Sequence, residues 1–104
     1  MIPDQNSGTV ITKQEAKTYI DAFKVRYPNE VTAFFVGASK VDLILRQPNC
    51  IGIRIYNGYN TAESKMNQVL VGVNAQQQDM SEGVIIERLI TCPPYCPSSG
   101  ALNQ

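Results

Sequence analysis

The sequence contains no histidine and no tryptophan among its 104 residues. Without histidine, the chain cannot build a Ser-His or Cys-His nucleophilic site, or a metal site that depends on imidazole ligands. An excess of charge is also missing, because nine basic and nine acidic residues cancel. A neutral chain lacks the basic surface that nucleic acids and anionic membrane surfaces attract. We therefore expect neither a nucleic-acid partner nor a membrane partner.

Long apolar runs and a disulfide framework are missing as well. No run approaches the roughly 18–20 apolar residues of a transmembrane helix. Residues 1–8 are polar and lack the positive charge and the apolar segment of a signal peptide, which leads us to expect a cytoplasmic protein. The three cysteines, Cys50, Cys92 and Cys96, are odd in number and too few for a disulfide scaffold. In a reducing compartment we expect all three to be free thiols.

The length and composition are those of one small globular domain. A hydrophobic fraction of 43% is close to the globular average, and 104 residues suffice for one domain but not comfortably for two. We expect a flexible lead over residues 1–10, a single α+β domain over residues 11–91, and an extended tail rich in proline and cysteine over residues 92–104.

Two helical segments are expected in the N-terminal half. Thr12 and Glu15 form a capping box, and an apolar stripe at helical spacing follows, so a helix is predicted over residues 13–27. Ser39 is the expected N-cap of a second helical segment, which stops before Pro48. The run 31–37 between them fits a short strand or one or two buried helical turns, and we favour helical or irregular structure.

Strands are expected from the middle of the chain onward. Residues 51–56 alternate three isoleucines with Gly52, Arg54 and Tyr56, and residues 69–73 place three valines on one face. We expect an antiparallel pair whose isoleucine and valine faces lie side by side under the helices, joined by a loop that begins at residue 57. Residues 84–90 are read as a third, edge strand, with helix as the alternative. The predicted fold is α+β, with two N-terminal helical segments packed on a small antiparallel sheet of two to three strands.

The segment Cys92-Pro93-Pro94-Tyr95-Cys96-Pro97 is the first candidate for chemistry. A residue before proline favours extended backbone, so the Cα atoms of Cys92 and Cys96 are expected roughly 12 Å apart, too far for a disulfide. Only a sharp turn at Pro94-Tyr95, for example with a cis proline, would close that gap. The prediction is a rigid extended tail. The alternative is a metal or redox thiol site that also uses Cys50. We predict no cofactor, and zinc is the metal that the alternative would take.

Other polar groups give weaker indications of a site. Arg54 and Tyr56, next to two mid-strand glycines, could bind a small anion, but we favour the ordinary exposed face of an antiparallel sheet as their explanation. Tyr59 and Tyr95 could join Tyr56 in a protein-contact surface. The closest carboxylate pair is Asp79 with Glu82, and a chain this short would not readily build the cleft that acid–base catalysis needs.

The motifs Gly52-Ile53-Arg54-Ile55-Tyr56-Asn57-Gly58 and Cys92-Pro93-Pro94-Tyr95-Cys96 occur in that order. In this order the chain resembles a group of small uncharacterised bacterial proteins with a G-x-R-I-Y-x-G strand and a C-P-P-x-C tail. The resemblance runs over about residues 12–97. It implies no activity and no site residue, but it implies that the cysteine–proline tail belongs to the pattern of the group.

These observations favour a non-enzymatic protein that acts through protein–protein contact or as a structural module. The expected partner is another protein or a second copy of this chain, which would form a homodimer. Strand edges, the tyrosine-bearing loop and the tail are the expected contact elements. The alternatives are a metal or thiol site at Cys92 and Cys96, with or without Cys50, and a small anionic ligand near Arg54.

Overall fold

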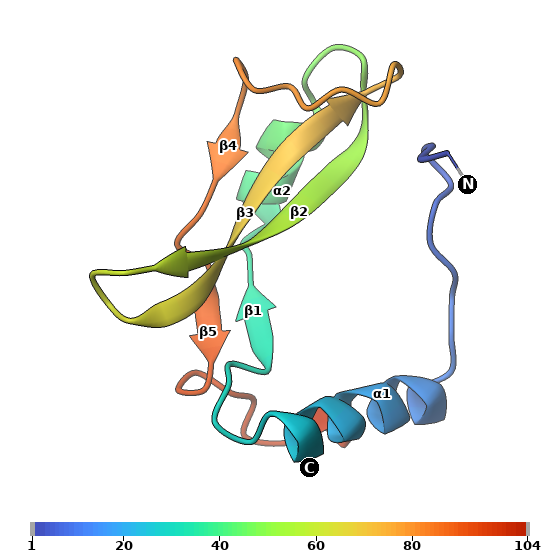
Figure 1. Cartoon of the computed structure of the whole chain (residues 1–104). Helices are drawn as coiled ribbons and strands as arrows, with labels where there is room; N and C mark the ends of the chain where they lie inside the picture. The colour runs from blue at the N-terminus through green and yellow to red at the C-terminus, as the bar shows by residue number, and fades with distance from the viewer. Residues whose placement is uncertain (1, 104) are drawn as a thin grey trace. The chain divides into compact units, whose positions relative to one another are not determined.

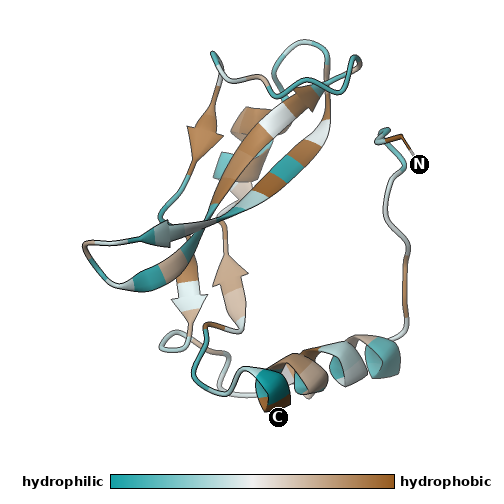
Figure 2. Cartoon of the chain, viewed as in Figure 1, coloured by the Kyte–Doolittle hydropathy of each residue, from teal (hydrophilic) through white to brown (hydrophobic). Residues whose placement is uncertain are grey.

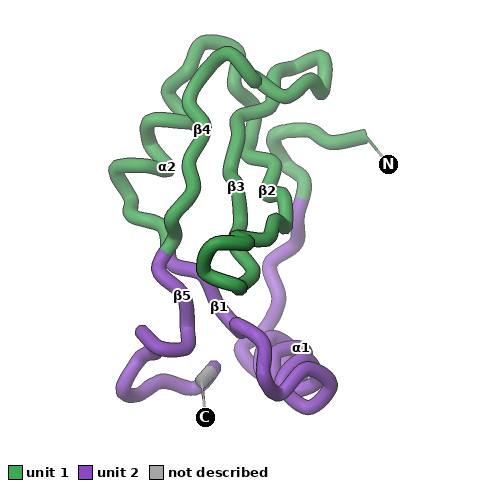
Figure 3. Tube along the Cα trace, turned by 60° about the vertical axis from the view of Figure 1, so that its left-hand side comes forward, with its two compact units in different colours: residues 1–7, 36–89 green, residues 8–35, 90–104 purple. Residues whose placement is uncertain are grey.

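The computed structural model describes residues 2–103, which form an α+β fold with antiparallel sheets of three and two strands (Figure 1). The predicted fold class is thereby confirmed. The chain divides into two compact units (Figure 3). The first unit contains residues 1–7 and 36–89, and the second contains residues 8–35 and 90–104. The lead, domain and tail expected from the sequence stay predictions, because compactness does not test which parts fold independently.

The first unit is built on a long antiparallel hairpin of β2 (Cys50–Asn60) and β3 (Lys65–Asn74). Both strands run further than predicted, so residues 57–60 are strand and the connection shrinks to Thr61–Ser64. The expected loop at residues 57–60 was wrong because cross-strand pairing with residues 65–68 overrides the turn preference of asparagine and glycine. The tyrosine in this segment, Tyr59, therefore lies on a strand.

The pairing register corrects the predicted faces of the hairpin. Ile53 lies opposite Gly72 and Ile55 lies opposite Leu70, whereas Arg54 lies opposite Val71. Directly opposed residues share a face, so the isoleucines and the valines lie on opposite faces of the hairpin. Alternation within each strand was predicted correctly. Which faces of the two strands coincide depends on their pairing register, and a shift by one residue would exchange the two faces of one strand.

The short helix α2 (Ala38–Leu45) packs on the isoleucine face, over Gly72. Ile44 is the one fully buried large side chain among the described residues, and its Cγ2 atom would lie 3.3 Å from a Cβ atom at Gly72. The predicted second helix is confirmed. The predicted cap at Ser39 is wrong, because the N-cap is Gly37, two residues earlier, and it makes no side-chain cap hydrogen bond.

Strand β4 (Ile85–Ile86) completes the three-stranded sheet, in the order β2-β3-β4. Gln47, two residues after the end of α2, fixes the backbone just before β4, because its side-chain Oε1 accepts a hydrogen bond from the Val84 N–H at 2.8 Å. In Figure 2, β4 and the C-terminal half of β3 are coloured as hydrophobic, in agreement with the buried residues Leu70, Val71 and Val73. The predicted edge strand is thus confirmed over residues 85–86 only.

The second unit contains α1 (Lys13–Arg26), β1 (Ala33–Phe35), β5 (Ile90–Cys92) and the 3-10 turn η1 (Ala101–Asn103). The predicted N-cap of α1 is confirmed, because Thr12 Oγ1 accepts from the Glu15 N–H at 3.1 Å. The reciprocal half of the predicted capping box differs, since the Glu15 carboxylate accepts from the Thr12 hydroxyl at 3.1 Å. The helical reading of residues 31–37 was wrong. Residues 33–35 form a strand that pairs antiparallel with β5, a long-range contact that no local pattern reveals.

The second unit has very little core. Of its described residues only Thr91 and Cys92 are buried, and α1 buries none of its side chains. Units of roughly 40 residues seldom bury enough apolar surface to be stable unless a disulfide, a metal or a partner helps. In the described residues no helix is long and apolar enough to cross a membrane.

The two mid-strand glycines of the hairpin should respond differently to alanine. A Cβ atom at Gly72 would lie 2.9 Å from Gln47 Nε2 and 3.1 Å from Cys50 Sγ, whereas a Cβ atom at Gly52 has no neighbour within 4 Å. We expect Gly72→Ala to lower the free energy of unfolding by about 1–3 kcal/mol through overpacking. Gly52→Ala, the matched control, should leave stability unchanged or raise it by up to about 1 kcal/mol. Urea unfolding of both variants checks this, and equal effects would contradict the packing of α2 over Gly72.

Candidate functional site

Arg54 and Tyr56 are brought together by a carboxylate. Both side chains stand on the valine face of β2, two residues apart. Arg54 Nη1 donates to Asp79 Oδ1 at 2.5 Å, and the Tyr56 hydroxyl donates to Asp79 Oδ2. Asp79 is held there by a β-bridge with Val73 and by the adjacent hydrogen bond from the Met80 N–H to the Gly72 carbonyl, at 2.8 Å.

The electrostatics of this cluster are those of a closed network. The hydrogen bond from Tyr56, followed by that from Arg54, lowers the pKa of Asp79 below its ordinary value. Contact with Asp79 raises the pKa of Tyr56 and of Arg54. Asp79 is therefore an ionised partner and not a general acid, and the charge of Arg54 is already matched. An incoming anion would have to displace Asp79 from Arg54.

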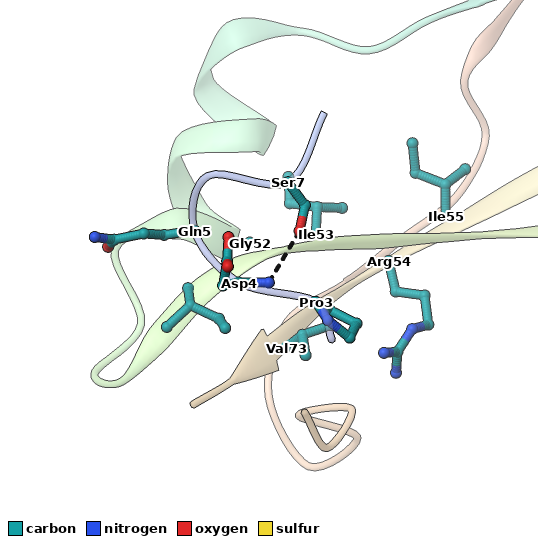
Figure 4. Close-up of a pocket in the computed structure, with 10 residues that line it drawn as sticks. Pro3, Asp4, Gln5, Ser7, Gly52, Ile53, Arg54, Ile55 and Val73 are labelled. Atoms are coloured by element: carbon teal, nitrogen blue, oxygen red, sulfur yellow. Dashed lines mark hydrogen bonds between the residues drawn. The ribbon is translucent and has the colours of Figure 1, made fainter. Parts of the chain in front are cut away.

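A cavity of about 400 Å³ lies beside Arg54, between the N-terminal segment and the edge of β2 (Figure 4). The segment forms a turn in which the Asp4 N–H donates to Ser7 Oγ at 2.9 Å, and the Asn6 N–H donates to Asp4 Oδ1 at 2.8 Å. In Figure 4 the guanidinium of Arg54 is turned away from the Asp4 carboxylate. Asp4 and Ser7 thus make hydrogen bonds within the N-terminal turn, and Arg54 is paired with Asp79.

Cys92 and Cys96 form a disulfide, with Cα atoms 4.7 Å apart. The predictions of free thiols and of a separation near 12 Å were therefore wrong for this pair. The chain turns back between the cysteines, with cis peptide bonds at Cys92–Pro93 and Pro93–Pro94 and a hydrogen bond from the Tyr95 N–H to the Thr91 carbonyl at 2.9 Å. Extended geometry had been expected because proline disfavours helical backbone before it, and that rule does not specify the cis isomer.

Cys50 remains a free thiol and belongs to the first unit, apart from the unit that holds the other two cysteines. Its Sγ atom donates to the Gly52 carbonyl at 3.2 Å, which makes it a packing residue beneath α2. No group of three or more cysteine, aspartate or glutamate side chains among residues 2–103 is arranged to hold a metal ion. The expectation that the protein has no cofactor stays a prediction.

An apolar groove of about 620 Å³ lies along β1 and β5 in the second unit. We define it by its lining residues, which are Ala33, Phe34, Phe35, Ile90, Cys92, Tyr95, Cys96 and Pro97. Phe35 lies opposite Ile90, and Ala33 lies opposite Cys92, so these four share the face that opens into the groove. Phe35 is 66% exposed and Ile90 is 47% exposed, although both are large and apolar.

The sequence identified some residues of these sites and missed others. The structure brings Arg54 and Tyr56 together on Asp79 and places Tyr95 on the groove, and their role in binding stays a prediction. Asp79 had been assigned to a carboxylate pair with Glu82, and its contact with Arg54 was missed. Phe35 and Ile90 were missed as site residues because their pairing joins strands 55 residues apart in the chain. Tyr59, predicted together with Tyr95, belongs to the first unit and lines none of the cavities described above.

Comparisons with known proteins add no family. No protein-family model matches the chain, and neither a curated protein nor a solved structure matches it significantly. The resemblance to small bacterial proteins with a C-P-P-x-C tail therefore stays a prediction, and no activity is transferred to this chain.

Asp79 should stabilise the fold only where its carboxyl is ionised. Its pKa is lowered in the folded state, so the unfolded state binds more protons in acid. The stabilisation is fully present above the ordinary aspartate pKa of about 3.9 and is lost as the pH falls through the lowered value. In urea unfolding at a series of pH values, the stability difference between wild type and Asp79→Asn should be constant near neutrality and shrink in acid.

The control for this experiment is Asp42→Asn, which removes the partner of Arg46 in an exposed pair on α2. It should change the free energy of unfolding by less than about 1 kcal/mol. A stability difference for Asp79→Asn that is the same at every pH would contradict the Asp79 network.

Proposed function

We propose that the protein is a non-enzymatic binding module that receives an extended, apolar polypeptide segment in the groove along β1 and β5. The observation that carries the proposal is the exposed apolar lining of this groove, which includes Phe35 and Ile90. An exposed cross-strand pair of this size is unusual for a surface that contacts only water. Binding of a partner would bury it.

The lining indicates the chemistry of the partner. Among residues 2–103, no charged side chain lines the groove. Its volume is within the range of sites that accept small ligands or single anchoring side chains. Tyr95, which is 73% exposed, offers an aromatic ring and a hydroxyl, a combination frequent in protein-contact surfaces. An apolar side chain of the partner would fill the groove without leaving a buried charge unpaired.

The strand arrangement favours a polypeptide over a small molecule. The sheet of β1 and β5 has only two strands, so each strand has one edge without a strand neighbour. An added strand would gain main-chain hydrogen bonds at such an edge, while alternate side chains enter the groove. Binding by strand addition needs a partner with extended backbone. It would use the strand edge and the groove at the same time.

The other functions expected from the sequence receive less support. An anion near Arg54 would compete with Asp79, and a metal at Cys92 and Cys96 would require reduction of their disulfide. The expected cytoplasmic location stays a prediction, and the disulfide counts against it because such bonds persist mainly in oxidising compartments. A second copy of the chain is the competing occupant of the groove, and the test below distinguishes it.

The test is selection from a phage-displayed library of random heptapeptides on the immobilised oxidised protein. We expect enrichment of uncharged sequences with large apolar residues. A selected peptide should bind at least about tenfold more weakly to Phe35→Ser and to Tyr95→Ser, the size of effect that loss of an interface anchor produces. Both side chains are exposed, so the variants should fold like wild type.

Tyr59→Ser is the matched control, because Tyr59 is a tyrosine of similar exposure, 61%, in the other unit. Its affinity for the peptide should equal that of wild type. Three results would contradict the proposal: no enrichment, binding that is lost in Tyr59→Ser instead, or a dimer in sedimentation equilibrium that Tyr95→Ser dissociates. The last result would assign the groove to a second copy.

A further inference from the structure

The two sulfur atoms of the Cys92–Cys96 disulfide have different surroundings. Cys92, on β5, is 5% exposed, whereas Cys96 is exposed and also lines a second hollow, of about 510 Å³. The hydroxyl of Thr32 has one proton and two acceptors within reach, the Cys92 carbonyl at 3.0 Å and Cys92 Sγ at 3.7 Å. The bond thus joins an exposed cysteine to a buried one, and the buried Cys92 meets the groove along β1 and β5 and has a hydrogen-bond donor beside its sulfur.

This asymmetry determines how a thiol would react with the bond. A thiolate attacks the sulfur that it can reach, and the reaction is faster when the departing sulfur is stabilised as a thiolate. Cys96 Sγ is the accessible target. Cys92 Sγ is the better leaving group, since a hydrogen bond from Thr32 to sulfur strengthens as negative charge develops there.

We propose that the Cys92–Cys96 disulfide is a thiol-exchange site at which an incoming thiol bonds to Cys96 and releases Cys92. The new bond joins the incoming sulfur to Cys96 Sγ, and the bond between Cys96 Sγ and Cys92 Sγ breaks. The electron pair of the broken bond stays on Cys92, which takes up the proton that the incoming thiol gave up. One disulfide is exchanged for another, so no further oxidant or reductant is needed.

The thiol has two possible sources, a small metabolite thiol or a cysteine on a bound polypeptide. The hollow that Cys96 lines carries the charged side chains Lys24 and Glu30, which suit a small charged thiol. Cys96 also lines the apolar groove, which suits a cysteine flanked by apolar residues. The exchange chemistry is the same for both and does not depend on the groove having a partner. The proposal can therefore stand even if the proposed binding function fails.

The experiment treats the oxidised protein, carrying Cys50→Ser to remove the third thiol, with reduced glutathione. The reaction is stopped with acid and N-ethylmaleimide, and the tryptic peptide 89–104, which contains both cysteines, is fragmented in a mass spectrometer. We expect glutathione on Cys96 and N-ethylmaleimide on Cys92 at least about ten times as often as the reverse. Because the starting protein keeps its disulfide, the result does not depend on a cysteine variant of the second unit folding.

Glutathione predominantly on Cys92, glutathione on both cysteines equally, or no mixed disulfide would each overturn the proposal. Thr32→Val tests the role of the hydroxyl as a positioning group: the rate of mixed-disulfide formation should fall severalfold, and Thr32→Ser should restore it. Unchanged kinetics in Thr32→Val would overturn the assignment of Cys92 as the stabilised leaving group.

A second arm distinguishes the sources of the thiol. A synthetic peptide with cysteine between apolar residues is compared with glutathione at equal thiolate concentration. If the thiol comes from a polypeptide, the peptide reacts faster, and Phe35→Ser removes the advantage without changing the rate with glutathione. If glutathione reacts at least as fast as the peptide, the site serves a small thiol.

Discussion

The fold of the first unit depends on the pairing register between β2 and β3. This register places Ile53 opposite Gly72 and Ile55 opposite Leu70, and so assembles one apolar face from both strands. Because Gly72 lacks a side chain, α2 can lie close to the sheet there, with Ile44 buried against it. The same register places Arg54 and Tyr56 on the opposite face, where the chain after β3 brings Asp79 to both. A shift by one residue would move the apolar set to the other face and separate Arg54 from Asp79.

The second unit is stabilised differently. Its strands are short, and its helix α1 buries no side chain. Its two buried residues are Cys92, which belongs to the disulfide, and Thr91, which precedes it. The loop-entropy account gives a disulfide across so short a loop roughly 2 kcal/mol of stabilisation. Such a unit can keep a face apolar and exposed, because its stability does not rest on burying that face. The disulfide thus allows the groove to stay exposed, because it provides stability that a buried core would otherwise supply.

The sequence revealed local structure well and long-range pairing poorly. The N-cap at Thr12 and the alternation around Ile53 are local, and both were interpreted correctly. A strand at Phe35 was the alternative that we did not favour, because its partner, Ile90, is distant in sequence. The face shared by the hairpin strands required a register that alternation alone does not supply. The contact of Asp79 with Arg54 depends on the path of the connector after β3, which no spacing rule gives. For Cys92 and Cys96, the spacing was visible, but the proline isomers that decide their separation were not.

We expect the disulfide, and not a large core, to maintain the structure around the groove. Hydrogen–deuterium exchange, followed by mass spectrometry on the oxidised protein and on the protein reduced under native conditions, tests it most directly. Reduction should lower protection in β1 and β5, while the β2–β3 hairpin keeps its protection. Equal loss of protection in both units, or unchanged protection in β1 and β5, would contradict it.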